Sequence, residues 1–516
     1  MPSPADQVKS LSAEQIVSLL QTNVQLAERV ASLEKQLAWF KNQVFGQTSE
    51  KRSVDVPGQG NLLGALAPQT NPEESLKETI TYERKKPQKN RGEAITDTGL
   101  RFDETVEVEE IRLSAPELEG PEADQYELID ERITYRLAHR RSSYVVLKYV
   151  QPVVKHKPSG TIATKSAPTP VLEKSLADVS LLVALLINKF LYHQPLYRQH
   201  QKLLLDGITL SRTTLTNYVH RTAQLLEPIY QAMLKTLLQS KVLAMDETPT
   251  KAGRKSQGKM QQAWYWTLLG DNDEMVFYYS ASRARKVVNE LLHGFNGTLV
   301  TDGYGVYASY VRDHANVTHA QCWMHNRRGY FYAKEDAPEE AAYAMELIAQ
   351  LYAQEGLAKE RANDQQAVLD YRLKHHQLLV DRFFDWVDEQ RQRVDVSPKS
   401  PLGEALRYSV NHEAQLRVFL GDPNVPLDTG AVERGLRPIP MGRRNWLFNW
   451  SEVGAHYTGI IQSLIVTCRM QGIHPRDYLV DVLQRIDLHP ASKIDELTPS
   501  QWKKRYGKNF LTSDVD

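Results

Sequence analysis

The sequence predicts a multidomain α+β protein in which a coiled coil, a small β module and a helical domain precede a mixed sheet interrupted by helices. Three observations support this fold class. Apolar residues repeat in heptads over residues 11–45, short apolar strands begin at residue 241, and only helical patterns occur over residues 338–420. A chain of 516 residues has room for about three or four units of ordinary size.

Composition excludes several classes of protein. The 63 basic and 63 acidic residues cancel, which excludes a uniformly basic nucleic-acid binder but allows a local basic groove. Two cysteines, Cys322 and Cys468, exclude a disulfide scaffold and a zinc ribbon. No apolar run approaches the ~20 residues of a membrane span, and the N-terminus does not resemble a signal peptide. We therefore expect a soluble, cytoplasmic protein with no membrane partner.

Residues 11–45 carry an apolar seam with alternating spacings of three and four. The seam consists of Ile16, Leu19, Asn23, Leu26, Val30, Leu33, Leu37, Phe40 and Val44. Asn23 occupies an a-type position, which favours a parallel homodimer in fixed register. The alternative is one amphipathic helix lying on its own protein. Residues 46–95, rich in Gly, Pro, Asn and Gln, are typical of a linker.

Charge separates within residues 96–168, where we expect a small β module. Twelve acids and one base lie between Asp103 and Glu131, and eight bases and no acid lie between Arg132 and Lys165. Two alternating segments in the basic part are typical of antiparallel strands. Two interpretations are open: the module follows a phosphate backbone, or its two halves neutralise each other.

Residues 170–240 are helical, and a Gly turn followed by Ser211 precedes the last helix. This outline is typical of a helix-turn-helix DNA-binding domain, with Arg212, Thr213 and Asn217 as candidate DNA contacts. Any three-helix bundle shows the same outline, so a structural role is the equal alternative.

Five short strands follow, over residues 241–246, 263–269, 275–279, 297–302 and 316–322. Two of them end in Asp246 and Asp302, and carboxylates at neighbouring strand ends can converge on two divalent cations. The order of three antiparallel strands, a helix and two further strands is that of the ribonuclease-H-like fold. For either aspartate alone, capping of a turn is the alternative.

Glu433 lies within a later helix and is the third candidate acid. Asp422 is expected to cap its own turn, Asp428 to cap the helix, and Glu452 to lie in a loop. The basic and aromatic residues near Glu433 reach a density that is typical of phosphate binding. They are Arg434, Arg437, Arg443, Arg444, Trp446 and Trp450. The alternative is that the tryptophans belong to the core and the arginines to a solvated surface.

Four segments resemble the successive signature blocks of DDE transposases of the insertion-sequence-66 family: VLAMDETPTK, LVTDGYGVYASY, QCWMHNRRGYF and DTGAVERGLRPIPMGRRNWLF. Three more resemble that family and extend the resemblance over nearly the whole chain: WFKNQVFGQTSEK, QPLYRQHQKLLLDGITLSRTTLTNYV and DELTPSQWKKRYG.

The resemblance implies that Asp246, Asp302 and Glu433 are the catalytic, metal-binding triad for two Mg²⁺ or Mn²⁺ ions. It divides a ribonuclease-H-like core into residues 241–335 and 426–475, with an all-α insertion over 336–425 and a tail over 476–516. Further residues implied are Cys322 and His325 for structure or DNA-end positioning, and Arg327 and Arg328 for DNA contact. The family's cysteine zinc module is degenerate here, because residues 96–165 lack cysteine, so we expect no zinc.

The sequence therefore predicts a bacterial DNA transposase that binds terminal inverted repeats and transfers a 3′-hydroxyl into target DNA. The implied partners are DNA, a second copy of the chain and accessory transposition proteins, at the nucleoid. Two alternatives are a catalytically inactive coiled-coil and helix-turn-helix regulator, and a related nuclease of the same fold.

We predict that replacing Leu26 and Leu33 with Lys converts the dimer to monomers, because buried charges in the seam oppose helix pairing. Light scattering on the full chain checks this. An unchanged mass would contradict dimerisation through residues 11–45.

Overall fold

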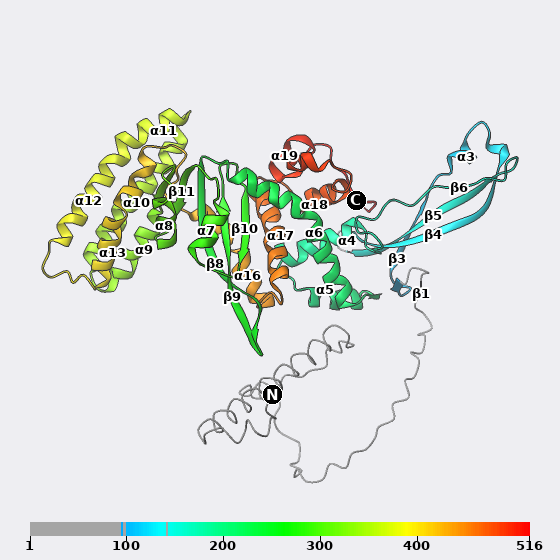
Figure 1. The fold of residues 1–516 in the computed structure, drawn as a ribbon, viewed down its shortest axis with the longest axis horizontal. Helices are drawn as coiled ribbons and strands as arrows, with labels where there is room; N and C mark the ends of the chain where they lie inside the picture. Colours follow the sequence, from blue (N-terminus) through cyan, green and yellow to red (C-terminus); the bar gives the residue numbers. More distant parts are fainter. Residues whose placement is uncertain (1–93, 96–99, 141–142, 516) are drawn as a thin grey trace, which may run out of the picture. The chain divides into compact units, whose positions relative to one another are not determined.

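The computed structural model describes residues 94–95, 100–140 and 143–515 (Figure 1). Contacts divide the chain into two units, residues 1–86 and 87–516, and every described residue belongs to the second. The predicted coiled coil and nearly all of the predicted linker therefore lie outside the described residues. None of the described helices is long and apolar enough to cross a bilayer.

The first described region is a β module built on one long hairpin. Strands β4 (Tyr126–Arg140) and β5 (Ser143–His156) pair antiparallel, while β3 (Glu107–Arg112) pairs parallel with β5. The shorter elements are α3 (Pro116–Glu119), η1 (Ala123–Gln125) and β6 (Ile162–Thr164). The two strands predicted in the basic part are confirmed as an antiparallel pair, but the module is not antiparallel throughout, because the acidic strand β3 adds in parallel to the free edge of β5 rather than to β4.

Ion pairs join the acidic and basic parts of this module. Arg140 pairs with Glu107 and Glu109, and Lys148 pairs with Glu110. At Arg140 and Lys148, these ion pairs favour the interpretation that the acidic and basic halves of the module neutralise each other.

The helical region begins with α4 (Val179–Leu186), the π-helical turn η2 (Ile187–Leu191) and α5 (Leu196–Leu205). The next helix, α6 (Arg212–Leu237), begins as expected at Ser211, whose hydroxyl accepts a hydrogen bond from the Thr214 N–H at 3.0 Å. The turn before it contains β7 (Ile208–Thr209), which pairs with β2 (Arg101–Phe102); β2 in turn pairs with β1 (Ala94–Ile95).

A mixed five-stranded sheet follows in the order β10-β9-β8-β11-β12. Its strands are β8 (Val242–Ser256), β9 (Lys259–Leu269), β10 (Met275–Ser280), β11 (Gly297–Thr301) and β12 (Val317–Gln321). Strand β9 pairs antiparallel with both β8 and β10, while β11 pairs parallel with β8 and β12 pairs parallel with β11. The mixed sheet expected from the strand pattern is therefore present.

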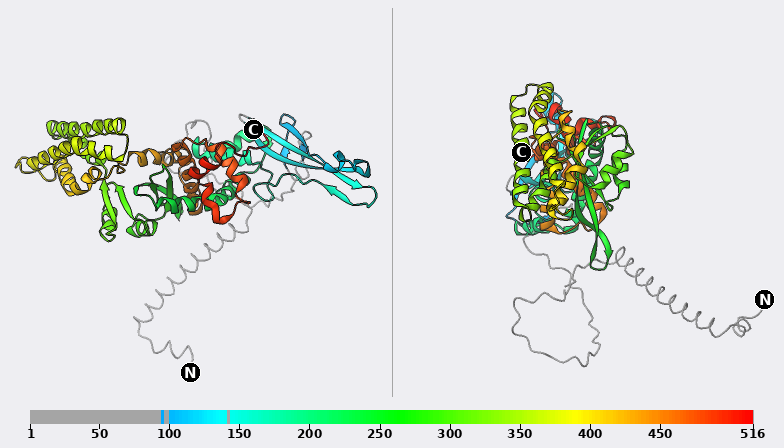
Figure 2. Two further views of the ribbon diagram at one scale, coloured as in Figure 1. Left: turned by 90° about the horizontal axis from the view of Figure 1, so that it is seen from above. Right: turned by 90° about the vertical axis from the view of Figure 1, so that its left-hand side faces the viewer.

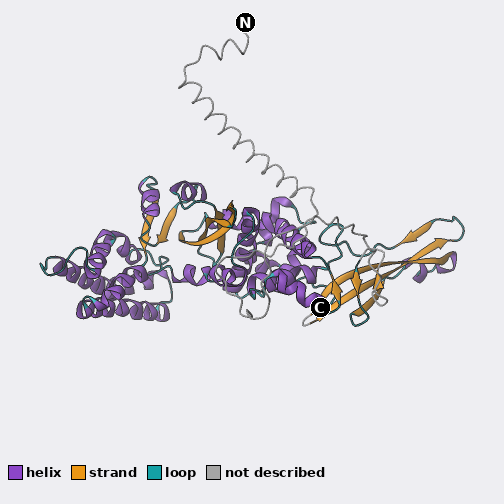
Figure 3. Cartoon of the chain, turned by 90° about the horizontal axis from the view of Figure 1, so that it is seen from below, coloured by secondary structure: helices purple, strands orange, loops and turns teal. Residues whose placement is uncertain are grey.

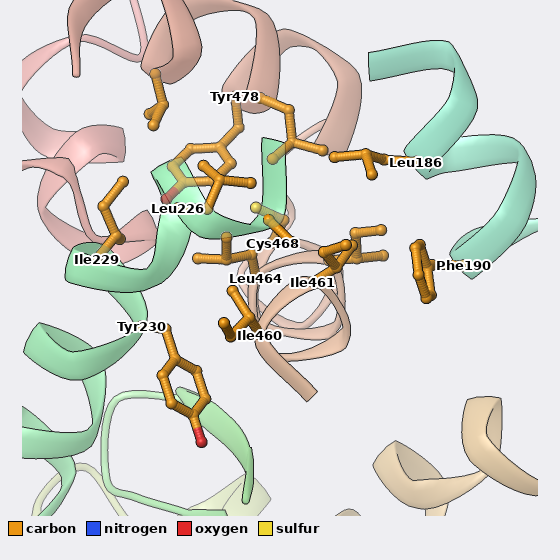
Figure 4. Packing of buried hydrophobic residues seen from close by; sticks show 14 of the residues in the cluster. Leu186, Phe190, Leu226, Ile229, Tyr230, Ile460, Ile461, Leu464, Cys468 and Tyr478 are labelled. Carbon is orange, nitrogen blue, oxygen red and sulfur yellow. The ribbon is translucent and has the colours of Figure 1, made fainter. Parts of the chain in front are cut away.

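Both faces of this sheet are buried, which explains why its strands are almost continuously apolar. Along β8, Leu243 and Met245 belong to one hydrophobic core, and Val242 and Ala244 belong to another. The first core includes α6, α17 (Glu452–Met470) and α18 (Pro475–Arg485), whose apolar side chains interdigitate in Figure 4. The second core includes the helices between β12 and α15.

The remaining helices lie around the sheet or follow it in the sequence (Figures 2 and 3). They are α7 (Arg285–Leu291), α8 (Gly305–Arg312), α9 (Trp323–Tyr332), η3 (Ala333–Glu335), α10 (Pro338–Arg361), α11 (Gln365–Tyr371), η4 (Arg372–His376), α12 (Gln377–Arg391), α13 (Pro401–Asn411), α14 (Glu413–Arg417), η5 (Val418–Leu420), α15 (Gly430–Leu436), α16 (Pro438–Trp446), η6 (Ala491–Leu497) and α19 (Pro499–Arg505). The predicted tail over residues 476–516 is folded rather than extended, because apolar side chains such as Tyr478 and Trp502 are buried in the first core.

Helix α17 covers the edge strand β10 closely. A Cβ on Gly459 would lie 2.5 Å from the Phe277 carbonyl oxygen, so only glycine allows this approach. The Ser463 hydroxyl accepts from the Phe277 N–H at 2.9 Å, and the Thr467 hydroxyl accepts from the Met275 N–H at 2.9 Å. Side chains of α17 thus satisfy the donors that an edge strand would otherwise expose.

We predict that Ser463→Ala destabilises the chain by about 1–3 kcal/mol, because the buried Phe277 N–H loses its acceptor. Thermal unfolding followed by circular dichroism measures the effect. Ser309→Ala is the control, since that hydroxyl contacts the exposed Arg312 side chain. Equal shifts for both variants would contradict the role given to Ser463.

Candidate active site

Strand β8 and the end of β11 bring Asp246 and Asp302 together. These parallel strands pair Ala244 with Val300, and each aspartate lies two residues further along in the same direction. Residues two apart on a strand point to the same face of the sheet, so the carboxylates of Asp246 and Asp302 lie on the same face, next to each other. The prediction that the first strand ends at Asp246 is wrong, because β8 continues to Ser256 in antiparallel pairing with β9.

The backbone holds each aspartate by one oxygen. Asp246 Oδ1 accepts from the Glu247 N–H at 2.8 Å, and Asp302 Oδ1 accepts from the Tyr304 N–H at 2.9 Å. Each carboxylate is thereby oriented through one oxygen.

Glu433 approaches this pair from α15. Its Oε1 lies 3.8 Å from His325 Nδ1 and 3.9 Å from an Arg328 guanidinium nitrogen, both on α9. Within the described residues, this buried oxygen has no hydrogen-bond partner. Glu433 therefore presents an unsatisfied carboxylate oxygen toward the positive Arg328 side chain and toward His325, whose pKa is lowered by burial.

The three acids interact electrostatically. Burial, together with repulsion from Glu247, Asp302 and Glu433, raises the pKa of Asp246 to about 7. A cluster of this kind carries excess negative charge at neutral pH, which a bound cation would relieve.

The donor set fits a hard divalent cation, because it consists of carboxylate oxygens and one of them lacks a partner. In the described part of the chain, no three His, Cys, Asp or Glu side chains converge tightly enough to hold a metal as they stand. The side chains of Asp246, Asp302 and Glu433 would therefore have to move closer to bind one.

The other candidates for the third acid are engaged elsewhere or positioned differently. Asp422 accepts from a backbone N–H two residues on, as expected for a turn cap. Asp428 is not the N-cap residue as expected, because α15 begins one residue later with Thr429 at that position. Asp428 Oδ1 accepts from the Gly430 N–H, and its Oδ2 accepts from the Tyr352 hydroxyl, each at 2.7 Å. The expectation that Glu452 lies in a loop is wrong: it begins α17, because the preceding serine caps that helix.

Sequence reasoning missed Glu247. Its side chain is only 2% exposed and receives hydrogen bonds from the Arg283 guanidinium and the Tyr307 hydroxyl. A signal was available, because strand alternation places Glu247 on the same face as Leu243 and Met245, and an acid at such a position needs a partner. Glu247 thus ties β8 to α8 and to the segment before α7.

Cys322 and His325 link the site to α15. The buried Cys322 sulfur accepts from the Thr429 N–H at 3.4 Å, and His325 faces Glu433 from the first turn of α9. Burial raises the pKa of the Cys322 thiol, which keeps it protonated. This geometry agrees with a structural or positioning role for the pair.

Helices from the region between β12 and α15 also touch the site. A Cβ on Gly303, next to Asp302, would lie 2.5 Å from the Tyr408 ring of α13. Tyr408 therefore packs on the turn that carries the second aspartate, and this contact leaves room only for glycine there.

The arginines near Glu433 do not all face it. Arg434 lies with Arg469 around a separate cavity of about 280 Å³ between α15 and α17, and Arg437 is exposed. Arg443 donates to the Pro249 carbonyl of β8, while Arg444 is exposed. Arg327, beside Arg328 on α9, is half-buried.

The two tryptophans of this region differ in environment. Trp446 is half-buried, with ring centroids 6.3 Å from Phe190 and 5.9 Å from His193. Its packing favours a structural role. Trp450, in contrast, is 66% exposed.

The candidate helix-turn-helix residues lie elsewhere, on the exposed side of the first turns of α6. Arg212, Thr213 and Asn217 are all exposed there. Asn217 also lines a cleft of about 840 Å³ between α6 and β4, together with Arg132, Arg136, Lys174 and Arg221 and with no acidic side chain. The structure thus joins two candidate DNA-binding regions that the sequence treats separately.

Comparison with known proteins gives a consistent assignment. A model of the transposase IS66 family matches residues 174–457, a model of the IS66 C-terminal element matches residues 463–500, and a model described as transposase C of IS166 homeodomain matches residues 32–111.

Three proteins of Sinorhizobium fredii (strain NBRC 101917 / NGR234), all described as uncharacterized, are similar to the chain. Protein y4qI is 29% identical over 65% of each chain; y4hP is 26% identical over 73% of this chain and 71% of its own length; y4jD is 28% identical over 65% and 68%. The chain thus spans 65% of the length of y4qI.

We predict that Asp246→Asn raises the thermal midpoint at about pH 8 but changes it little at about pH 4. The folded-state pKa of about 7 exceeds the ordinary value of 3.8, so ionisation of Asp246 opposes folding increasingly as pH rises between these values. Asp364→Asn, at an exposed helix cap, is the control and is expected to change the midpoint little at either pH, because Asn caps a helix about as well as Asp. A lower midpoint for Asp246→Asn at about pH 8 would contradict the assigned repulsion.

Proposed function

The chain belongs to the IS66 family of transposases, and we propose that it cuts DNA at the terminal inverted repeats of a bacterial insertion sequence and joins the freed 3′-hydroxyl to target DNA. The observation that carries this proposal is the approach of Glu433, with its unpartnered oxygen, to Asp246 on β8 and Asp302 just after β11.

The sheet supports a ribonuclease-H-like core. Three antiparallel strands, β8 to β10, are followed by β11 and β12, which run parallel to β8 on its other side. In this proposal α15 and α17 complete the core after the helical insertion.

Asp246, Asp302 and Glu433 are proposed to hold two Mg²⁺ or Mn²⁺ ions. When bound, such ions activate the attacking oxygen and stabilise the leaving oxygen of a phosphodiester. The chain's own contribution is position: the backbone N–H groups of Glu247 and Tyr304 fix the aspartates, and α15 fixes the glutamate.

Positive groups beside the acids are suited to hold the phosphate. Arg328 already faces Glu433, and the exposed Arg437 and Arg444 extend the positive surface along α15 and α16. His325 also faces Glu433, but burial lowers its pKa and favours the neutral imidazole. Arginine binds phosphate oxygens through paired N–H donors, so it orients the scissile bond as well as neutralising it.

Recognition of the inverted repeats is proposed for α6. Arg212, Thr213 and Asn217 would contact base edges or phosphates, and the basic cleft beside them would hold the adjacent backbone. Homodimerisation through residues 11–45 would present two such domains to the two ends of an element.

We predict that Glu433→Gln, Asp246→Asn and Asp302→Asn each reduce metal-dependent cleavage more than about a hundredfold, because even outer-shell partners of a metal contribute about 10–100-fold. The substrate is a plasmid carrying the genomic segments on both sides of the gene, and gel analysis measures nicking and strand joining. Binding to the same DNA should persist.

Asp428→Asn and Glu452→Gln are matched controls that remove one charge near Glu433 in sequence. Both are expected to cleave at near-normal rates. If Glu433→Gln cleaves normally while either control abolishes cleavage, the third acid is misassigned. Cleavage without strand joining would favour a nuclease over a transposase.

A further inference from the structure

Strands β8 and β9 continue well beyond the active site as a two-stranded arm, residues 250–263 (Figure 1). Strand β11 pairs with β8 only over Val242–Ala244, and β10 pairs with β9 only over Trp264–Leu269. The arm therefore leaves the sheet on the same strand that carries Asp246.

The outer part of the arm is strongly basic. Residues 251–259 contain Lys251, Arg254, Lys255 and Lys259 and no acid. All four side chains are exposed, and none of the three lysines forms an ion pair with a carboxylate in the described part of the chain. The acidic side chain of Glu452 lies against Gly253 of this stretch.

A short loop after α16 fastens onto the arm. The Asn449 N–H donates to the Lys251 carbonyl at 3.0 Å, and the Gly253 N–H donates to the Asn449 carbonyl at 3.3 Å. The loop begins at Leu447, which has a positive φ of 67° and is exposed. A β-ribbon of two strands is marginal alone, so this docking stabilises it.

The same loop displays Trp450. Among the described tryptophans it is the exposed one, and the Arg254 guanidinium lies 5.1 Å from its ring centroid. Neither an exposed indole nor a leucine at positive φ is explained by folding stability, and both features occur where the loop meets the basic arm.

We propose that the arm and Trp450 hold an unpaired DNA segment beside the cleavage site, with the lysines on its phosphates and the indole stacked on a base. This rests on the proposed function and deepens it. At about 3.3 Å per residue, Lys251 lies about 16 Å along β8 from Asp246, the length of about five base-pair steps. A strand leaving the acids along β8 therefore meets the lysines within a few nucleotides.

The test measures binding by fluorescence anisotropy in the full chain carrying Asp246→Asn, without divalent ions, so it does not depend on cleavage. The probes are one duplex with a single-stranded overhang and the same duplex made blunt. The variant is Lys251→Gln, Lys255→Gln and Lys259→Gln combined. For the overhang probe, the variant should weaken the salt dependence of binding. The magnitude of the slope of log affinity against log salt should fall by about two, at about 0.7 for each lost phosphate contact.

The control combines Lys374→Gln, Lys399→Gln and Lys508→Gln, which removes the same charge from exposed positions elsewhere. Trp450→Ala should weaken overhang binding by about fivefold or more and leave blunt binding unchanged, while Trp450→Phe retains stacking and excludes a folding defect.

The proposal is overturned if the arm variant matches the control, or if Trp450→Ala affects both probes equally or neither. A changed mass by sedimentation with unchanged DNA binding would show that the arm contacts protein instead. Arm-dependent binding by a wild-type chain that does not cleave would contradict the proposed function and leave the arm assignment intact.

Discussion

The parallel pairing of β8 with β11 is the constraint on which the site depends. It places two carboxylates at one sheet edge, where they repel each other and lose part of their hydration. Backbone N–H groups hold one oxygen of each aspartate, and the buried Glu247, which adds to the repulsion on Asp246, is itself paired with Arg283. The surrounding contacts therefore keep in place an arrangement that is unfavourable in itself.

Much of this was predictable from the sequence, because it depends on local periodicity. The segments before Asp246 and Asp302 have short apolar patterns, and a sheet buried on both faces makes such patterns continuous. The continuation of β8 past Asp246 to Ser256 was not predicted, because that stretch is mostly polar. The start of α6 was predictable too, since a serine cap is a local signal. Its length was not, because burial against α17 extends it past Pro228.

Other features depend on contacts between distant segments, which periodicity does not encode. The parallel addition of β3 to β5 follows from charge pairing across the sheet, as between Lys148 and Glu110. The packing of Trp446 on Phe190 joins residues far apart in the chain. The proximity of Glu433 to His325 likewise follows from the Cys322 contact with Thr429, which no spacing rule predicts.

That contact also fixes where the helical insertion leaves and re-enters the core. The Trp323 N–H donates to the Leu427 carbonyl at 2.9 Å, so the two ends of the intervening segment are neighbours. Domains form in order as a chain emerges from the ribosome, and Glu433 is synthesised after the whole insertion. A growing chain thus holds two of the three proposed acids until the insertion has folded and brought α15 back to the sheet. Assembly order itself would then delay completion of the proposed metal site until the residues after the insertion have been synthesised.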